Sequence, residues 1–330
     1  MTLNRPKVLN TLSTEVLEKI HAVLNRVGRR TLIIQGSGKV LCAGGDVVAL
    51  ITHFVICPVF LQTEYSVVDR IHRSESFSVA IMKGLTMGGG AGLAGACKAR
   101  VAMQSTQWAF PEVAIGVTPD VGGSYILTRL TSKAVGLYLA LAGERINGAD
   151  CFYLGAATHY VDEARLPELI QTLQSSPNPA QVLEQFHSAP DRSLCSVLKQ
   201  QSLIEEIFTN VPTIEELFSR LSRHPSDWAK QTLASLQFMC PLSLKVELRN
   251  FELGAKMTHQ EALSIEYNSI IQMIFVDNTN FAEGVRTRLV TKKKNVRPAW
   301  VPATVEEVTD QMVERCMANS GGPRFHPRQY

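Results

Sequence analysis

The hydrophobic pattern near the start of the chain predicts an amphipathic helix over residues 12–24. Its apolar positions recur at helical spacing, at Leu12, Val16, Leu17, Ile20, Val23 and Leu24. Short, continuous apolar runs follow at 31–36, 78–82 and 99–103, and their length is typical of buried strands. Helical patterns separate these runs. Because strands and helices alternate, the first half is expected to form a mainly parallel sheet wrapped by helices, an α/β fold.

The pattern changes after about residue 175. Residues 175–180 read SSPNPA, a turn-rich break, and almost every pattern beyond it is helical. The residues of a capping box mark three helix starts, namely Thr213 with Glu216, Thr258 with Glu261 and Thr304 with Glu307. We therefore divide the chain into a core region, 1–175, and a helical C-terminal region, 176–330. The helical region is expected to cover the active site, to build an oligomer interface, or to do both.

Charge and hydropathy argue against two kinds of partner. The net charge is only +3 over 330 residues, whereas a nucleic-acid platform would carry a concentrated basic face. The one dense basic run, 291–294, has Arg286, Arg288 and Arg297 nearby. It fits a solvated surface or a docking site for the phosphates of a ligand. No apolar stretch reaches the roughly 20 residues that span a membrane, so no membrane partner is expected.

Cysteine and histidine patterns exclude several chemistries. The seven cysteines form no C-x-x-C pair, which favours free thiols over a disulfide framework or a zinc site. There is no H-E-x-x-H and no G-x-S-x-G, so a metal-dependent or serine hydrolase has no support. The opening residues, MTLNRPKVLN, show no signal or transit segment. They resemble the end of a strand running into a turn, so the first strand is expected to be truncated.

A glycine-dense segment, GLTMGGGAGLAG at 84–95, follows the second predicted strand. Residues 90–95 fit G-x-G-x-x-G, which after a strand is typical of a dinucleotide-binding turn. The alternative is a loop that presents backbone N–H groups to another ligand. The paired glycines of CAGGD, at 42–46, allow the same approach, although a tight turn with Asp46 as a helix N-cap explains that loop on its own. Two separate donors directed at one carbonyl oxygen would make an oxyanion hole.

Three acidic residues lie in apolar surroundings. Glu112 and Asp120 belong to the segment 107–123, which is rich in apolar residues and glycine. Burial raises the pKa of a carboxyl toward values that suit proton transfer, so the pair indicates acid–base chemistry. Capping of turns or helices is the alternative. Glu64 lies on the apolar face of a predicted helix, where a polar ligand, a buried partner or local contact with solvent would explain it.

Together these segments resemble the crotonase superfamily of enoyl-CoA hydratases and isomerases. The likeness covers nearly the whole chain and is carried most strongly by TLNRPKVLNTLS, CAGGDV, PVFLQTEY, GLTMGGGAGL, FPEVAIGVTPDVGGSYILTRL, LALAGERINGAD and GAATHYVD. It continues more weakly through MCPLSLKVELRNFELG and EYNSIIQMI. The implied fold is a crotonase-like spiral of ββα turns. An acyl-CoA would bind with its thioester carbonyl at two backbone N–H groups, by position those of Gly45 and Gly89.

Within the superfamily, the residues match best the branch that hydrolyses 3-hydroxyisobutyryl-CoA in valine breakdown. Hydratases carry two catalytic glutamates, which would fall at positions 92 and 112, but position 92 is glycine here. They usually have glycine where this chain has Asp120. The resemblance implies thioester hydrolysis, with Glu112 as nucleophile or as the base that activates water. Asp120 would orient the substrate or water and help to protonate the leaving thiolate, and Glu64 would bind the 3-hydroxyl.

Other activities stay open beside this one. The chain could be an enoyl-CoA hydratase or isomerase, or an acyl-CoA-binding protein without turnover. A nicotinamide-dependent dehydrogenase would need an acidic residue closing the next strand, whereas Glu112 follows Phe110 and Pro111. The resemblance implies an acyl-CoA as the small-molecule partner and no metal or further cofactor, since coenzyme A is part of the substrate. A mitochondrial location is expected, and a homo-oligomer is compatible with it.

Overall fold

The computed structural model describes residues 1–53, 57–276, 279–292 and 295–318. The chain forms two compact units, each assembled from separate stretches. The first unit comprises Met1–Gly45, Thr63–Ala109 and Arg145–Gln200, and the second Asp46–Gln62, Phe110–Glu144 and Gln201–Tyr330. The units interleave along the sequence, whereas the hydrophobic pattern suggested a single boundary near residue 175. Every described strand belongs to the first unit, and the described part of the second consists of helices and loops.

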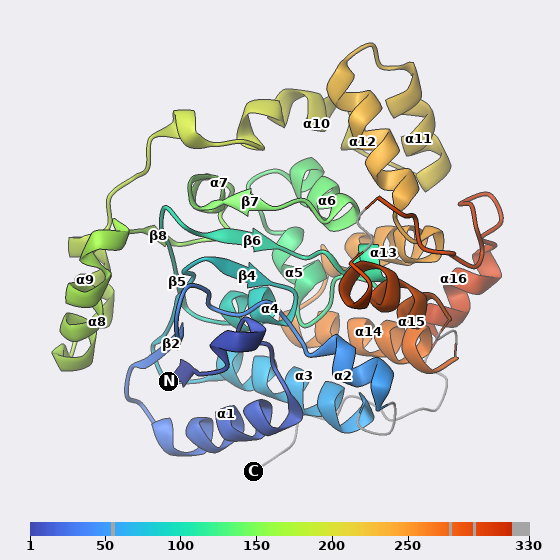
Figure 1. Ribbon diagram of the computed structural model, residues 1–330. Helices are drawn as coiled ribbons and strands as arrows, with labels where there is room; N and C mark the ends of the chain where they lie inside the picture. Colours follow the sequence, from blue (N-terminus) through green and yellow to red (C-terminus); the bar gives the residue numbers. More distant parts are fainter. Residues whose placement is uncertain (54–56, 277–278, 293–294, 319–330) are drawn as a thin grey trace. The chain divides into compact units, whose positions relative to one another are not determined.

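Two sheets form the centre of the first unit (Figure 1). The larger sheet is entirely parallel, in the order β1-β2-β3-β5-β8, and the smaller has the order β4-β6-β7 with β6 and β7 antiparallel. Consecutive strands β3 and β4, and then β5 and β6, go one to each sheet, so the chain passes repeatedly between them. The strands are β1 (Thr2–Leu3), β2 (Leu32–Gly36), β3 (Ser78–Ile81), β4 (Leu85–Met87), β5 (Ala99–Ala102), β6 (Gln107–Ala109), β7 (Ile146–Asn147) and β8 (His159–Tyr160).

The elements expected in the first unit are confirmed. The helix predicted over 12–24 is α1 (Thr14–Val27), and the three apolar runs form β2, β3 and β5, which pair in parallel. Strands β4, β6, β7 and β8 were not predicted, because runs of two or three residues show no hydrophobic period. The opening residues, expected to be the end of a truncated strand, form the two-residue strand β1, which pairs with β2 at the sheet edge.

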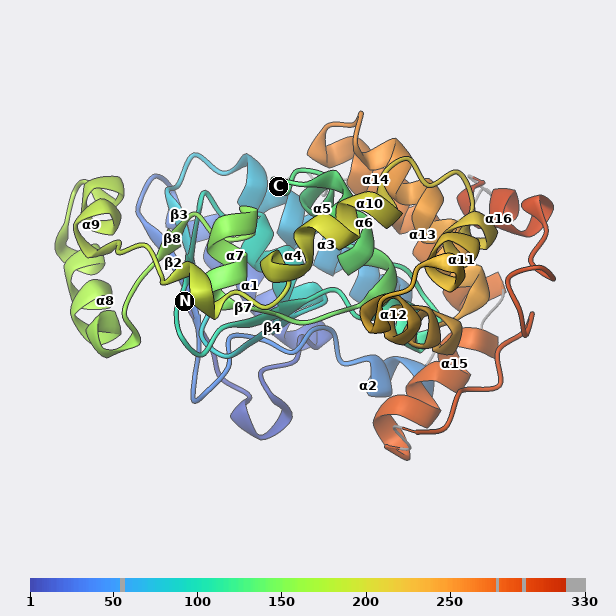
Figure 2. The same cartoon turned by 90° about the horizontal axis from the view of Figure 1, so that it is seen from above.

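Helices α8 and α9 cover one face of the larger sheet and lie side by side in both views (Figures 1 and 2). Leu169, Leu183 and Phe186 from these helices pack with Val79 and Val101 of the sheet in one buried cluster. The helices of this unit are α1, α4 (Gly89–Gly95), α7 (Gly148–Leu154), α8 (Leu166–Ser175) and α9 (Pro179–Phe186), with short 3₁₀ turns η1 (Pro6–Val8), η4 (Glu163–Arg165), η5 (Arg192–Leu194) and η6 (Leu198–Gln200).

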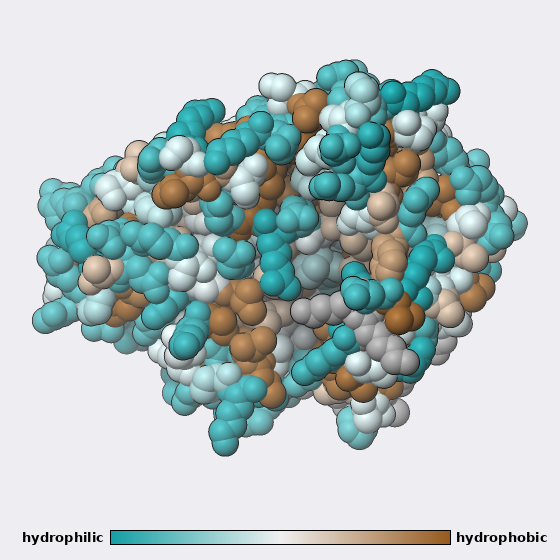
Figure 3. Space-filling view, turned by 45° about the horizontal axis from the view of Figure 1, so that its top comes forward, coloured by the Kyte–Doolittle hydropathy of each residue, from teal (hydrophilic) through white to brown (hydrophobic). Residues whose placement is uncertain are grey.

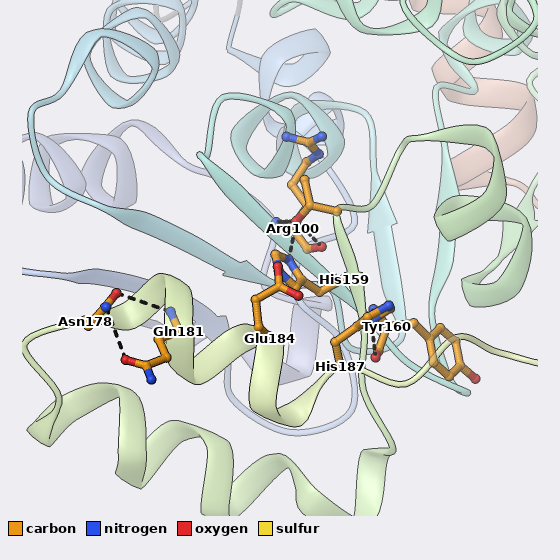
Figure 4. A network of polar contacts seen from close by, with 8 residues as sticks. Arg100, His159, Tyr160, Asn178, Gln181, Glu184 and His187 are labelled. Carbon is orange, nitrogen blue, oxygen red and sulfur yellow. Dashed lines mark hydrogen bonds and ion pairs between the residues drawn. The ribbon is translucent and has the colours of Figure 1, made fainter.

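Polar contacts also fasten α9 to the edge strand β8 (Figure 4). His159 Nε2 lies 3.3 Å from Glu184 Oε1, and His187 Nδ1 lies 3.1 Å from the Tyr160 backbone nitrogen. Burial lowers the pKa of His159, and the neighbouring Glu184 carboxylate opposes that change. Asn178 caps α9 by accepting the Gln181 N–H. Each contact joins or ends secondary structure, so the cluster has a structural role.

The second unit is helical, and two of the three predicted helix starts are confirmed. Thr213 caps α11, and Thr258 completes a capping box at α14. The helix start at Thr304 is wrong, because Glu307 accepts the N–H groups of Ala303 and Thr304 within a turn and α16 begins later. The helices are α2 (Val47–Thr52), α5 (Gly123–Leu127), α6 (Lys133–Ala142), α10 (Gln201–Phe208), α11 (Ile214–Arg223), α12 (Asp227–Phe238), α13 (Pro241–Gly254), α14 (His259–Ile271), α15 (Thr279–Val285) and α16 (Asp310–Met317), with η3 (Glu112–Ile115), η7 (Gln272–Val276) and η8 (Arg286–Val290). Helix α3 (Cys57–Arg73) starts in this unit and continues into the first.

Hydrophilic side chains predominate on the surface shown in Figure 3, and hydrophobic residues form separate groups among them. None of the described helices combines the length and the apolar character needed to cross a bilayer.

Candidate active site

Two glycine loops of the first unit bring two backbone nitrogens close together. Gly44 has φ +104°, a left-handed conformation that glycine adopts without steric penalty. A methyl group on Gly44 would lie 3.6 Å from the Gly89 nitrogen, and one on Gly89 would lie 3.4 Å from the Gly45 nitrogen. Within the described residues, neither the Gly45 nor the Gly89 N–H donates a hydrogen bond. Two such neighbouring donors are what an oxyanion hole requires.

The G-x-G-x-x-G match at 90–95 lies inside helix α4. Strand β4 ends at Met87, Gly88 has φ +51°, and α4 begins at Gly89. In a dinucleotide-binding turn these glycines would form the turn before the helix. Their position inside α4 therefore argues against a dinucleotide-binding turn. Gly92, where a hydratase would place a glutamate, is buried within the same helix. In the other loop, Asp46 caps α2 by accepting the Ala49 N–H at 3.4 Å, as the capping explanation predicted.

Glu64 is buried next to Gly89. It lies on α3 and is 4% exposed, so the prediction that it occupies the buried face of a helix is confirmed. A methyl group added to Gly89 would collide with Glu64 Oε1. The carboxylate of Glu64 therefore ends close to the two nitrogens of the glycine loops, where it can contact whatever they bind.

The second unit holds the other two predicted residues. Glu112 opens the short helix η3 and is 7% exposed, while Asp120 is half-buried in the loop before α5. The charges of both act on a third, fully buried carboxyl, that of Glu247. The structure thus groups Glu112 with Asp120 in the second unit and groups Gly45, Gly89 and Glu64 in the first.

Two carboxyls beside this pair were missed from the sequence, Glu247 on α13 and Glu266 on α14. Both are fully buried. Glu247 follows Leu244 by three residues and precedes Phe251 by four, so it lies on an apolar helix face. That is the same signal that singled out Glu64, and it could have identified Glu247 too.

Helix α13 follows the segment that carries Glu112 and Asp120. The Cys240 N–H at its start donates to the Val113 carbonyl oxygen at 3.2 Å, and Asn250 Nδ2 donates to Thr118 Oγ1 at 3.4 Å. Glu247 lies between these two contacts along the helix. Neither of its carboxyl oxygens has a hydrogen-bond partner among the described residues. Burial, and then the charges of Glu266, Glu112 and Asp120, raise the pKa of Glu247 well above 4.5.

We expect Glu247→Gln to stabilise the protein increasingly as the pH rises. Between pH 4.5 and the raised pKa, Glu247 keeps its proton in the folded chain but loses it on unfolding. One such proton lowers the free energy of unfolding by about 1.4 kcal/mol per pH unit. Glutamine removes this slope. Urea unfolding should therefore give the variant a higher free energy of unfolding than the wild type. This difference should be larger at pH 7.5 than at pH 5.5, by up to about 3 kcal/mol. If the variant and the wild type differed in free energy of unfolding by the same amount at both pH values, the expectation would be contradicted.

Other candidate sites can be placed only in part. No group of three or more His, Cys, Asp or Glu side chains among the described residues is arranged to hold a metal ion, and all seven cysteines are buried free thiols. Lys293 and Lys294 of the basic run lie outside the described residues. Arg286 pairs with Glu283, and Arg297 donates to two backbone carbonyls. Docking of a ligand's phosphates at this segment stays a prediction.

Similarity to known proteins supports the resemblance seen in the sequence. The sequence profile of the enoyl-CoA hydratase/isomerase family matches residues 1–317. The mitochondrial 3-hydroxyisobutyryl-CoA hydrolase of Xenopus laevis is 36% identical over 97% of this chain and 86% of its own length. The human protein of the same name is 37% identical over 94% of this chain and 83% of its own length.

Solved structures agree on the fold. A carnitinyl-CoA dehydratase from Mycobacterium thermoresistibile superposes with a TM-score of 0.90 at 30% identity, over 100% of this chain and 96% of its own. An enoyl-CoA hydratase from Rhodobacter sphaeroides gives a TM-score of 0.85 at 31% identity, over 97% and 94% of the two chains. The fold is therefore the crotonase fold that the sequence implied, and the chain belongs to the enoyl-CoA hydratase/isomerase family.

Proposed function

We propose that this chain hydrolyses the thioester of 3-hydroxyisobutyryl-CoA to the free acid and coenzyme A, with 3-hydroxypropionyl-CoA as a second candidate substrate. The observation that carries the proposal is that Glu112 and Asp120 both act on the buried carboxyl of Glu247, in a chain that has glycine at position 92. Relatives named 3-hydroxyisobutyryl-CoA hydrolase, at 35–37% identity, support it. Those relatives are named as mitochondrial, which supports a mitochondrial location here as well.

Each residue has a defined task in this reaction. The N–H groups of Gly45 and Gly89 would bind the carbonyl oxygen as it gains negative charge, and losing one such donor typically costs about 3 kcal/mol of transition-state stabilisation. Glu112 would attack the acyl carbon itself or take a proton from the attacking water. Water finally supplies the hydroxyl group of the acid and the proton on the coenzyme A sulfur. Asp120 would guide that proton, and no cofactor takes part.

A hydratase activity is the second candidate, because the two structural relatives are named as a hydratase and a dehydratase. Hydration would consume a double bond and leave the thioester intact. Thiol release from 3-hydroxyisobutyryl-CoA and loss of enoyl absorbance from crotonyl-CoA, measured side by side, separate the two. We expect one thiol per substrate consumed and no loss of enoyl absorbance. Hydration without thiol would favour the hydratase, and binding without either reaction would indicate an acyl-CoA-binding protein.

Glu64→Ala should change the choice of substrate more than the chemistry. A buried carboxylate beside the oxyanion donors can accept a hydrogen bond from a hydroxyl group on the acyl chain. Without it, kcat/KM for 3-hydroxyisobutyryl-CoA should fall by about 10- to 100-fold, as expected for one lost hydrogen bond to a charged group. For isobutyryl-CoA, which lacks the hydroxyl, the loss should stay below about threefold. Equal losses on both substrates would show that Glu64 does not read the hydroxyl.

A further inference from the structure

The loop at 118–124 carries Asp120 and has a strained backbone directly after it. The next residue, Val121, has φ +48° and is fully buried, and Gly122 has φ +93°. A β-branched residue rarely occupies the left-handed region and does so only where its surroundings hold it there. The Gly123 N–H donates to the Asp120 carbonyl oxygen at 2.9 Å and closes the turn. Some other part of the protein must therefore maintain this loop.

Glu266 supplies the strongest contacts to the loop. Its Oε2 accepts the Gly122 N–H at 2.6 Å, and its Oε1 accepts the Ser124 N–H at 2.8 Å. The Ser124 hydroxyl donates to the same Oε1 at 2.5 Å. Glu266 comes from α14, more than a hundred residues further along the chain. One fully buried carboxyl group thus accepts three hydrogen bonds from Gly122 and Ser124, within four residues after Asp120.

The two buried carboxyls of this region have opposite surroundings. Burial raises the pKa of Glu266 to about 8, while the three donors of Gly122 and Ser124 favour its charged form. Glu247 has no donor to stabilise a charge. The groups that act on it are the carboxyls of Glu266, Glu112 and Asp120. Of the two, Glu266 is therefore the buried carboxyl whose oxygens are held by hydrogen-bond donors.

We propose that Glu266 is a positioning residue for Asp120, which it holds in its working place through the N–H groups of Gly122 and Ser124. The inference rests on the proposed function, because the part of Asp120 in thioester cleavage belongs to that proposal. Glu266 acts on the loop backbone and has no task of its own in the chemistry. Its replacement should therefore lower kcat and leave substrate binding nearly unchanged.

Glu266→Gln is the direct test. Glutamine has the same size, but its amide NH₂ would face at least one of the three donors and repel it. We expect kcat for thiol release to fall by about 10- to 100-fold, the loss typical of a catalytic group displaced by about 1 Å, with KM within about threefold. The matched control on the same helix is Glu261→Gln. Glu261 is exposed, and glutamine can replace glutamate in its capping box, so kcat should not change.

A double-mutant cycle separates positioning from a general structural role. If Glu266 acts through Asp120, its replacement should have no further effect once Asp120→Asn has been made. The kcat of Asp120→Asn and that of the double variant should then agree within about twofold. A loss by the same factor in both backgrounds would overturn the proposal. If Glu266→Gln fails to fold, Ser124→Ala serves instead, because it removes one of the three donors. Its smaller decrease in kcat must likewise disappear when Asp120→Asn is already present.

A crystal structure of Glu266→Gln gives a readout that does not depend on turnover. We expect Val121 to leave its positive φ, and an unchanged loop would overturn the proposal. Should the wild type release no thiol from 3-hydroxyisobutyryl-CoA, the proposed function fails while this structure still decides whether Glu266 holds the loop. If Glu266→Gln does not fold, the crystal structure of Ser124→Ala is compared with that of the wild type in the same way.

Discussion

Glu112→Gln is expected to lower the rate of thiol release by about 10³-fold or more. Glutamine preserves the size of the side chain, but it is neither a nucleophile nor a base, and such a group contributes on the order of 10²- to 10⁴-fold or more to a reaction of this kind. The variant should fold, because glutamine keeps the size of the side chain and adds no charge beside the buried Glu247. The assay is thiol release at saturating 3-hydroxyisobutyryl-CoA.

A matched control uses the same substitution at a glutamate outside the cluster. Glu184 pairs with His159 at the edge of the sheet, and its side chain is 72% exposed. Glu184→Gln should keep the full rate. Retention of more than a tenth of the wild-type rate by Glu112→Gln, with the control unaffected, would remove Glu112 from the chemistry. It would also end the hydrolase proposal in its present form.

Local patterns in the sequence predicted those parts of the fold that local forces determine. The helix α1 and the strands β2, β3 and β5 were found because each shows its own hydrophobic period or a continuous apolar run. Strand β4 is three residues long and exists because it pairs with β6, a contact that no local pattern reveals. The interleaved units escaped prediction for the same reason, since they depend on contacts between distant segments.

The candidate site shows the same limit. Glu64 was identified because burying a single charge on an apolar helix face costs free energy, so such a residue stands out in the sequence. Glu247 and Glu266 carry that signal too, but they lie in a helical region without glycine-rich motifs nearby. Only the folded chain shows Glu266 bound to Gly122 and Ser124, 144 and 142 residues away in sequence. Motifs identified the residues proposed for the chemistry, and tertiary contacts identified those that support them.

The glycine-dense loop gives the second large effect, because a single methyl group at Gly89 would lie beside the two N–H groups proposed as the oxyanion hole. That methyl group would lie 3.4 Å from the Gly45 nitrogen and would displace the carboxylate of Glu64. Glu64 can swing aside at little cost, since its carboxylate is the end of a flexible side chain, so the fold should survive. We expect Gly89→Ala to lower kcat for thiol release by about 10²- to 10³-fold, the range measured for loss of an oxyanion donor.

A control variant and two substrates distinguish whether the methyl group blocks the two N–H donors or only displaces Glu64. Gly28, at the end of α1, has φ +57° and open space around it. Gly28→Ala should therefore cost about 1–3 kcal/mol of stability and no activity, the reverse of Gly89→Ala. Displacement of Glu64 alone would impair only 3-hydroxyacyl substrates, whereas blocking the Gly45 and Gly89 donors must impair isobutyryl-CoA equally. If Gly89→Ala spared isobutyryl-CoA, these two N–H groups would not form the oxyanion hole, since every thioester needs its carbonyl oxygen stabilised whatever its acyl chain.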